Sequence, residues 1–248
     1  MKTNYAIFGG ILMLGLSSVA PSIKAETFQI DTRIVDLTID VKREPVFPIS
    51  LQQQGYSDGK VVIAFEVDYS GELRDWIVLE ATHPAFVDAL ANVIDTWDFS
   101  PPKINGESRS IVSRLIVNYH TSGNVLSFDL VSGLATRFNE LTGWQSQRIA
   151  LAEVADLDSP PTPTRVIKPS VPKDVLQKYS GSKAVFTFYV DENGRVRIPV
   201  LHRIDGEADP GMLLAAQEAL EQWRFEPPTV NSHPVSIQLS QQFVFADR

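Results

Sequence analysis

The chain contains an internal repeat, and this repeat limits the possible folds more than any other feature of the sequence. Residues 97–102 read Trp-Asp-Phe-Ser-Pro-Pro, and residues 223–228 read Trp-Arg-Phe-Glu-Pro-Pro. The tryptophan, the phenylalanine and both prolines recur at the same spacing, 126 residues further along. Solenoid repeats are about 20–50 residues long, so this distance predicts two copies of one domain-sized unit.

Two further motifs extend the repeat upstream of the tryptophans. A strand-like alternation at 61–67 runs into a Val-Asp-x-x-Gly turn ending at Gly71, and the alternation at 184–190 runs into the same turn ending at Gly194. Before each strand lies a Pro-x-x-Pro motif, at 45–48 and at 169–172. Their common order predicts that both copies share one topology.

Each copy is predicted to fold as β-β-α-β. The alternating strand and its turn begin a hairpin. The apolar period then changes to that of a helix, with Pro84 at the first helical position of the first copy and Asp209 as the N-cap of the second. The paired prolines end this segment, and a closing strand follows at 111–119 and 235–245.

The repeat and its flanks divide the chain into five segments. The Pro-rich stretch 159–164 is predicted to be a stiff, extended linker between the copies. The segments are a signal sequence at 1–25, an extended N-terminal segment or strand at 26–44, a first domain at 45–119, a partly helical connector with the linker at 120–168, and a second domain at 169–248.

The first residues resemble a secretory signal. Lys2 is followed by an apolar run from Tyr5 to Ala20, and Ala25 is a small residue suited to cleavage. The alternative is an uncleaved inner-membrane anchor, which a run shorter than about 18 residues with three glycines suits poorly. We therefore expect a periplasmic protein.

Charge and cysteine content exclude several function classes. The formal net charge is −8, and removal of Lys2 and Lys24 with the signal makes it −10. An acidic chain without a basic run is a poor partner for nucleic acid or anionic lipid. The chain has no cysteine, which excludes disulfides, thiol catalysis and thiolate metal sites.

Other catalytic or metal-binding patterns are absent from the sequence. The four histidines (His83, His120, His202 and His233) have no metal-ligand spacing. The turn at 191–194 faintly resembles a calcium loop, but His202 stands where the twelfth-position glutamate belongs. No nucleophile elbow or phosphate loop occurs. We expect a non-enzymatic protein without cofactor, metal or small-molecule substrate.

The motifs together resemble the C-terminal domain of TonB-type energy transducers. The order is Pro-x-x-Pro, an alternating strand, Val-Asp-x-x-Gly, a helix ending in Trp-x-Phe-x-Pro-Pro, and an apolar closing strand. The resemblance implies an α+β fold of two tandem ββαβ domains, each a three-stranded antiparallel sheet with one helix. The short apolar start and the few residues before Pro45 differ from transducers, which have a motor-coupled membrane helix and a long periplasmic spacer.

In this family the domain binds outer-membrane transporters by accepting a short segment as an added strand at a sheet edge. The resemblance therefore implies envelope proteins, such as TonB-dependent transporters, as partners. The closing strands are the expected acceptors, with Leu115, Val117 and Tyr119 in the first domain and Ile237, Leu239 and Gln241 in the second.

Two further sets of residues have alternative interpretations. The Pro-x-x-Pro elements either dock a partner or fix an extended lead into the first strand; they comprise Pro45, Phe47, Pro48, Pro169, Val171 and Pro172. The Trp-x-Phe-x-Pro elements are expected to be structural core anchors rather than ligand-stacking aromatics; they comprise Trp97, Phe99, Pro101, Trp223, Phe225 and Pro227.

Two function classes remain open on the sequence. The first is a TonB-like adaptor that binds a strand of another envelope protein, with one site in each domain. The second is a structural scaffold or peptidoglycan-associated protein in which the sheet edges are covered. Free edges favour the adaptor, and covered edges favour the scaffold.

Overall fold

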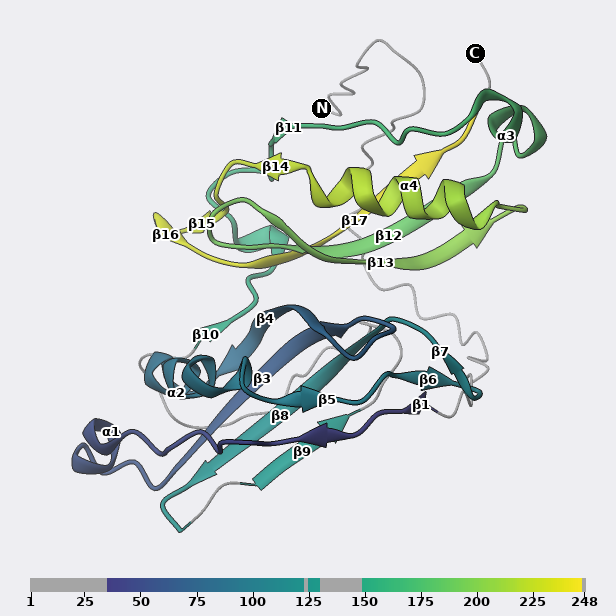
Figure 1. Cartoon of the computed structure of the whole chain (residues 1–248). Coiled ribbons are helices and arrows are strands. Elements are labelled where there is room, and N and C mark those ends of the chain that lie inside the picture. Colours follow the sequence, from purple (N-terminus) through teal and green to yellow (C-terminus); the bar gives the residue numbers. More distant parts are fainter. Residues whose placement is uncertain (1–34, 123–124, 130–148, 247–248) are drawn as a thin grey trace, which may run out of the picture. The chain divides into compact units, whose positions relative to one another are not determined.

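The computed structural model describes residues 35–122, 125–129 and 149–246 (Figure 1). The expected signal sequence at 1–25 lies outside the described residues. The chain divides into two compact units, an N-terminal unit at Asp31–Leu151 and a C-terminal unit from Ala152 onward. Each unit has its own hydrophobic core.

The N-terminal unit is built around a five-stranded antiparallel sheet with the order β10-β4-β3-β8-β9. Helix α2 packs against β3 and β4. The elements of this unit are β1 (Val35–Asp36), β2 (Ile39–Asp40), α1 (Ile49–Gln53), β3 (Asp58–Val67), β4 (Leu73–Ala81), α2 (Pro84–Ile94), β5 (Asp98–Phe99), β6 (Lys103–Ile104), β7 (Glu107–Ser108), β8 (Ile111–His120), β9 (Val125–Asp129) and β10 (Ile149–Ala150).

The C-terminal unit contains a three-stranded antiparallel sheet with the order β13-β12-β17. Helix α4 lies across one face of this sheet (Figure 1). The elements of this unit are the 3₁₀ turn η1 (Val154–Asp156), β11 (Pro163–Arg165), α3 (Lys173–Lys178), β12 (Lys183–Val190), β13 (Val196–Asp205), α4 (Pro210–Glu221), β14 (Arg224–Phe225), β15 (Thr229–Val230), β16 (His233–Pro234) and β17 (Ile237–Val244).

The predicted hairpins and helix starts are confirmed. Strands β3 and β4 pair around the Val-Asp-x-x-Gly turn, as do β12 and β13. Helix α2 begins at Pro84, where His83 Nδ1 accepts from the Ala85 N–H. Helix α4 begins at Pro210, where the Asp209 carboxylate accepts from two backbone N–H groups. Both arrangements satisfy donors that a helix leaves unpaired at its N-terminus.

Both units contain the same hydrogen bond from a tryptophan side chain to a backbone carbonyl. Trp97 donates its indole N–H to the carbonyl of Arg43 at 2.8 Å, and Trp223 donates to the carbonyl of Ile167 at 2.8 Å. Both acceptors lie two residues before a Pro-x-x-Pro motif. Next to each tryptophan, a short upstream strand pairs with the strand that follows the helix, as β2 with β5 and β11 with β14.

The cores of the two units are packed differently where the helix meets the start of the first hairpin strand. In the N-terminal unit, a Cβ on Gly59 would lie 2.1 Å from the Phe86 ring, and the Tyr119 hydroxyl donates to the Phe86 carbonyl at 2.9 Å. The corresponding residues of the C-terminal unit are Ser182, Met212 and Phe245. The flexible methionine leaves room for a side chain where the rigid phenylalanine requires glycine.

The structure confirms an α+β fold with mostly antiparallel strands and few helices, but it corrects two expectations. The N-terminal sheet has five strands instead of three, because β9 and β10 come from the segment 120–168 that was expected to be a connector. The predicted linker 159–164 belongs to the C-terminal unit, because β11 pairs with β14 and the Glu226 N–H donates to the Thr162 carbonyl at 2.9 Å.

Candidate functional site: the sheet edges

Strand β17 forms an uninterrupted edge of the C-terminal sheet. It pairs with β12 through eight consecutive residue pairs, from Lys183 with Val244 to Val190 with Ile237, without a register shift. In the described part of the chain, the only other backbone pairing of β17 is an isolated bridge from Ala152 to Ile237 at its first residue. The side of β17 from Ser240 onward has no neighbouring strand there.

The hydrogen-bonding pattern identifies which backbone groups face this open side. Along an antiparallel strand, successive residues direct their N–H and C=O alternately to one neighbour and to the other. The Phe245 N–H donates to the Ser182 carbonyl at 3.0 Å, so Phe245 faces β12. It follows that Ser240, Gln242 and Val244 direct both backbone groups to the open side. An edge of this kind is a template for strand addition.

The other edge of this sheet, β13, is a poorer template. Its pairing with β12 shifts register twice, and Ile198 has a φ of 47°. Pro199 follows directly and has no N–H to donate. Register shifts and prolines are the devices by which proteins protect edge strands from pairing. The open edge suited to a partner is therefore β17.

The predicted residues of this edge point toward the core. Ile237, Leu239 and Gln241 are all buried, together with Phe243, on the face that α4 covers. Their N–H groups face β12, so the backbone groups available to a partner belong to the alternate residues. The predicted strand thus lies at a sheet edge, but its outward backbone groups belong to other residues than the three predicted, because hydrogen-bond direction depends on the pairing register.

Gln241 is a buried polar residue with a specific role at the edge. The residue is 3% exposed, and its Nε2 donates to the carbonyl of Gln242 at 2.7 Å. That carbonyl is one of the groups directed to the open side. The side-chain amide thus supplies a hydrogen bond that a neighbouring strand would otherwise make.

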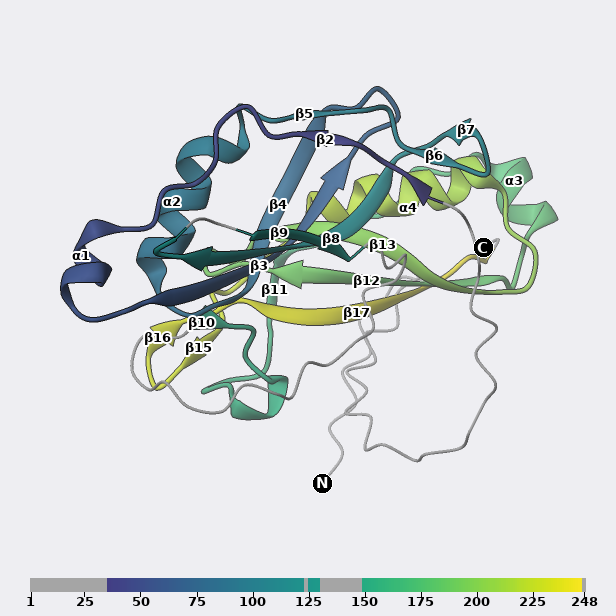
Figure 2. The same cartoon turned by 90° about the horizontal axis from the view of Figure 1, so that it is seen from below.

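In the N-terminal unit the corresponding edge is covered. Strand β9 pairs with β8 over five residue pairs, so β8 is an interior strand (Figure 2). The expectation that Leu115, Val117 and Tyr119 mark an acceptor edge is wrong for this reason. All three are buried in the core, where burial also raises the pKa of Tyr119 above its usual range.

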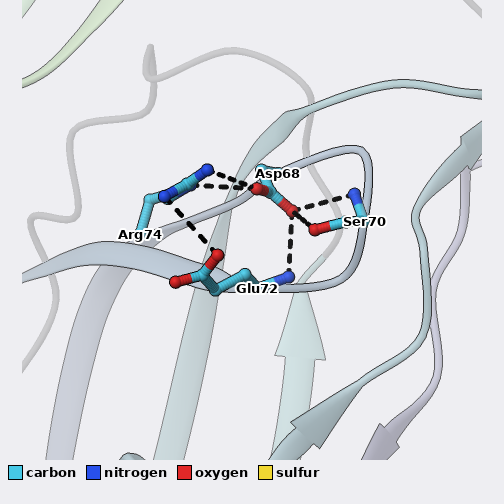
Figure 3. A network of polar contacts seen from close by, with 4 residues as sticks. All are labelled: Asp68, Ser70, Glu72 and Arg74. Carbon is cyan, nitrogen blue, oxygen red and sulfur yellow. Dashed lines mark hydrogen bonds and ion pairs between the residues drawn. The ribbon is translucent and has the colours of Figure 1, made fainter.

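The turn between β3 and β4 shows why the Val-Asp-x-x-Gly motif recurs (Figure 3). Asp68 accepts from the Ser70 hydroxyl at 2.6 Å and from the Ser70 and Glu72 N–H groups, and Arg74 pairs with its other oxygen at 2.8 Å. The Ser70 hydroxyl, more than any other contact, lowers the pKa of Asp68 to about 2. In the C-terminal unit, Asp191 accepts from the Asn193 and Arg195 N–H groups at 2.9 Å each.

The glycine of this turn is required by both its backbone and its surroundings. Gly71 has a φ of +92°, and a Cβ there would lie 2.4 Å from the Phe99 carbonyl oxygen. Gly194 has a φ of +74°, and a Cβ would lie 2.0 Å from the Phe225 carbonyl oxygen. The turn thus packs directly on the Trp-x-Phe element, which explains why the two motifs occur together.

Part of the chain matches a known protein family. Residues 43–121 match the family described as Gram-negative bacterial TonB protein C-terminal. No curated protein matches the chain. The TonB C-terminal match begins at Arg43, whose carbonyl receives the Trp97 indole N–H, and ends one residue after β8. Strand β9, which covers β8, lies beyond the matched residues.

The Pro-x-x-Pro residues have a structural place in both units. Pro48 and Pro172 are the N-cap residues of α1 and α3. The Phe47 ring packs edge-on against Phe86 with centroids 5.2 Å apart, and Val171 packs against the C-terminal core. Pro45 is buried and Pro169 is half-buried. These contacts favour the interpretation that the motif fixes the lead into the first strand.

The tryptophans and phenylalanines of the repeated element are core residues, as expected. Trp97, Phe99, Trp223 and Phe225 are all buried. The expectation for the prolines needs a correction, because Pro101 and Pro227 are exposed. The second proline of each pair, Pro102 or Pro228, is buried instead, and its carbonyl accepts a backbone N–H at 2.9 Å.

Two features are absent from the described residues. No helix among them is long and apolar enough to cross a bilayer. Within the same residues, no group of three or more His, Cys, Asp and Glu side chains is arranged to hold a metal ion.

Proposed function

We propose that this protein is an exported, non-enzymatic, TonB-like adaptor that binds a segment of another envelope protein as an added strand on β17. The observation that carries the proposal is the uninterrupted edge with outward backbone groups at Ser240, Gln242 and Val244. The match of residues 43–121 to the TonB C-terminal family lies in the N-terminal unit and supports binding to envelope proteins as the class of function. TonB-dependent transporters of the outer membrane are the first candidate partners.

The proposal treats both units as TonB C-terminal-like domains, in tandem. The second unit repeats the tryptophan clamp, the aspartate turn and the positive-φ glycine of the matched region. Only the second unit is proposed to bind, because β9 covers the equivalent edge of the first. That covered edge favours a structural role for the N-terminal unit.

The decisive experiment removes one outward backbone N–H. The control is a variant that changes the same side chain but keeps this N–H. Gln242→Pro removes an N–H that faces the open side without removing a bond to β12, whereas Gln242→Ala keeps the N–H. The protein with a photo-crosslinking residue in place of Ser240, and otherwise unchanged, is expected to capture a defined envelope protein. The alanine variant is expected to retain this capture and the proline variant to lose it.

Circular dichroism and thermal unfolding establish that both variants are folded. Equal capture by Gln242→Pro and Gln242→Ala would show that backbone strand addition at β17 is not the mode of binding. The proposed periplasmic location has a separate test, because mass spectrometry of the protein from the envelope fraction should find a mature chain beginning at Glu26.

A further inference from the structure

Each unit has a short hairpin between its helix and its closing strand, and the turn of each hairpin begins with asparagine. Asn105 and Gly106 join β6 to β7, and Asn231 and Ser232 join β15 to β16. The two asparagines are 126 residues apart, the distance that also separates the tryptophans of the repeat. All four turn residues have a positive φ, between 51° and 86°, as type I′ hairpin turns require.

The side-chain amide of an asparagine can react with the backbone of the residue that follows it, which makes asparagine a chemically labile residue. The backbone nitrogen of the next residue bonds to the amide carbon and ammonia leaves, which closes a succinimide ring. Water then opens the ring at one of its two carbonyls and gives aspartate or isoaspartate. The attacking nitrogen must lose its proton, so a free, exposed N–H favours the reaction, and a following glycine leaves the nitrogen unobstructed.

The turn of the N-terminal unit meets these conditions. Asn105 and Gly106 are both exposed, and a Cβ on Gly106 would meet no atom within 4 Å. Among the residues that the structure describes, none accepts a hydrogen bond from the Gly106 N–H. The hairpin is joined by two residue pairs between β6 and β7, so it can open at its tip and let the Asn105 amide reach this nitrogen.

The equivalent turn of the C-terminal unit is protected by Asp158. The carboxylate of Asp158 accepts from the Asn231 N–H at 2.9 Å, from the Ser232 N–H at 2.8 Å and from the Thr229 hydroxyl at 2.8 Å. The nitrogen that would attack the Asn231 amide therefore already donates to a carboxylate, which opposes the loss of its proton. Ser232 also has a side chain beside this nitrogen, whereas Gly106 has none.

A second Asn-Gly pair, at 193–194, is protected in a different way. Asn193 is exposed, but Gly194 is buried, and its N–H donates to the Asp191 carbonyl at 2.9 Å. The Gly194 carbonyl in turn accepts from the Phe225 N–H at 2.8 Å. Asn105 and Asn193 are followed by the same residue, so a difference in their reactivity must come from the fold.

We propose that Asn105 is a site of spontaneous deamidation and that its conversion to isoaspartate loosens the small sheet β1-β6-β7. Isoaspartate adds a methylene to the main chain at the tip of the hairpin, so the β6–β7 pairs lose their register. Strand β6 also pairs with β1, and the loosening therefore extends to that strand. The main sheet is paired separately and should keep its structure. This inference is independent of the binding proposed for β17.

The first test compares the three asparagines within one purified full-length protein. The protein is aged at mildly alkaline pH and digested, and mass spectrometry with fragmentation measures aspartate and isoaspartate at each site. Asn105 should convert about tenfold faster or more than Asn193 and Asn231, because the nitrogens beside the other two are hydrogen-bonded. In urea, Asn193 should convert as fast as Asn105. Equal rates at these two residues in the folded protein would overturn the proposal, as would a difference that persists in urea.

A variant tests whether the backbone hydrogen bonds are the source of the protection. Asp158→Ala leaves the Ser232 N–H without its acceptor and should speed conversion at Asn231, while the rate at Asn105 stays that of the wild type. An unchanged rate at Asn231 would show that these hydrogen bonds do not control the reaction, and would remove the reason for singling out Asn105.

The structural consequence has its own control. Asn105→Gly removes the reactive amide and keeps a residue that suits the type I′ turn. The Arg109 N–H donates to the Pro102 carbonyl at 2.9 Å at the base of the hairpin. Hydrogen exchange of this amide should become faster as the wild type ages, but not in Asn105→Gly, and the Ile63 amide of β3 should stay protected in both. An Arg109 amide that stays protected in protein converted to isoaspartate would show that the hairpin is not loosened.

Discussion

At the residue scale, each tryptophan combines a buried ring with one hydrogen bond to distant backbone. Trp223 is fully buried and lies 6.1 Å from the Phe243 ring between centroids. Its N–H reaches a carbonyl 56 residues earlier in the chain. The same residue therefore fills the core and fixes the position of the segment before Pro-x-x-Pro.

Two substitutions separate these contributions. Trp223→Phe keeps most of the apolar volume and leaves the Ile167 carbonyl without this donor, which should lower the free energy of unfolding of the C-terminal unit by about 1–3 kcal/mol. Trp223→Ala should lower it by roughly 3–5 kcal/mol. Urea unfolding of the three proteins measures both losses. An equal loss in both variants would show that ring volume contributes little.

The ionisation of Asp68 makes the stability of the N-terminal unit depend on pH. The pKa of Asp68 is lowered from 3.8 to about 2 in the folded protein. The contribution of its ionised form to stability is therefore complete above about pH 4 and is lost as the pH falls toward 2. Asp68→Asn should destabilise the N-terminal unit near neutral pH, and the difference from wild type should shrink through this window.

Unfolding midpoints at several pH values between about 2 and 7 test the pH effect. Asp88→Asn is the matched control, because Asp88 is exposed on α2. A difference between wild type and Asp68→Asn that stays constant down to pH 2 would mean that ionisation of Asp68 is not the source of the stability.

At the element scale, β9 decides whether the N-terminal sheet has an open edge. The Thr121 N–H donates to the Ser57 carbonyl, so Ile116 directs its backbone groups to β9, where it stands opposite Ser127. Ser127→Pro removes one donor of this pairing, and Ser127→Ala keeps it.

The proline variant should release β9 and expose β8. Hydrogen exchange of the Ile116 and Asn118 amides should become faster in Ser127→Pro and stay at the wild-type rate in Ser127→Ala. Unchanged protection in both variants would show that β9 contributes little to covering this edge.

The sequence was sufficient for the elements that the repeat contains and insufficient for those outside it. The Val-Asp-x-x-Gly turns and the helix starts at Pro84 and Asp209 follow from local chemistry, and the structure has them as predicted. Strand β9 was missed, although Leu126 and Phe128 alternate with Ser127 and Asp129. Five residues of alternation show a possible strand but not which edge it pairs with.

At the scale of the whole molecule, two cores predict two unfolding events. The two buried clusters, which contain Trp97 and Trp223 respectively, belong to separate compact units. Trp97→Ala should lower the stability of one transition and Trp223→Ala that of the other, by roughly 3–5 kcal/mol each. Calorimetry of wild type and both variants checks this. A single transition that both substitutions lower would show instead that the units unfold together.

The contact between Gly59, Phe86 and Tyr119 has a consequence for any recombination of the two units. A side chain at position 59 would collide with the phenylalanine, and the tyrosine hydroxyl needs the carbonyl that this helix presents. A chimera that grafts α2 onto the C-terminal sheet would therefore bring Phe86 against Ser182, whereas α4 on the N-terminal sheet would place Met212 beside a glycine and leave a void. The two units share a hairpin, a helix and a closing strand, but the side chains of their cores fit together differently and can be exchanged only as complete sets.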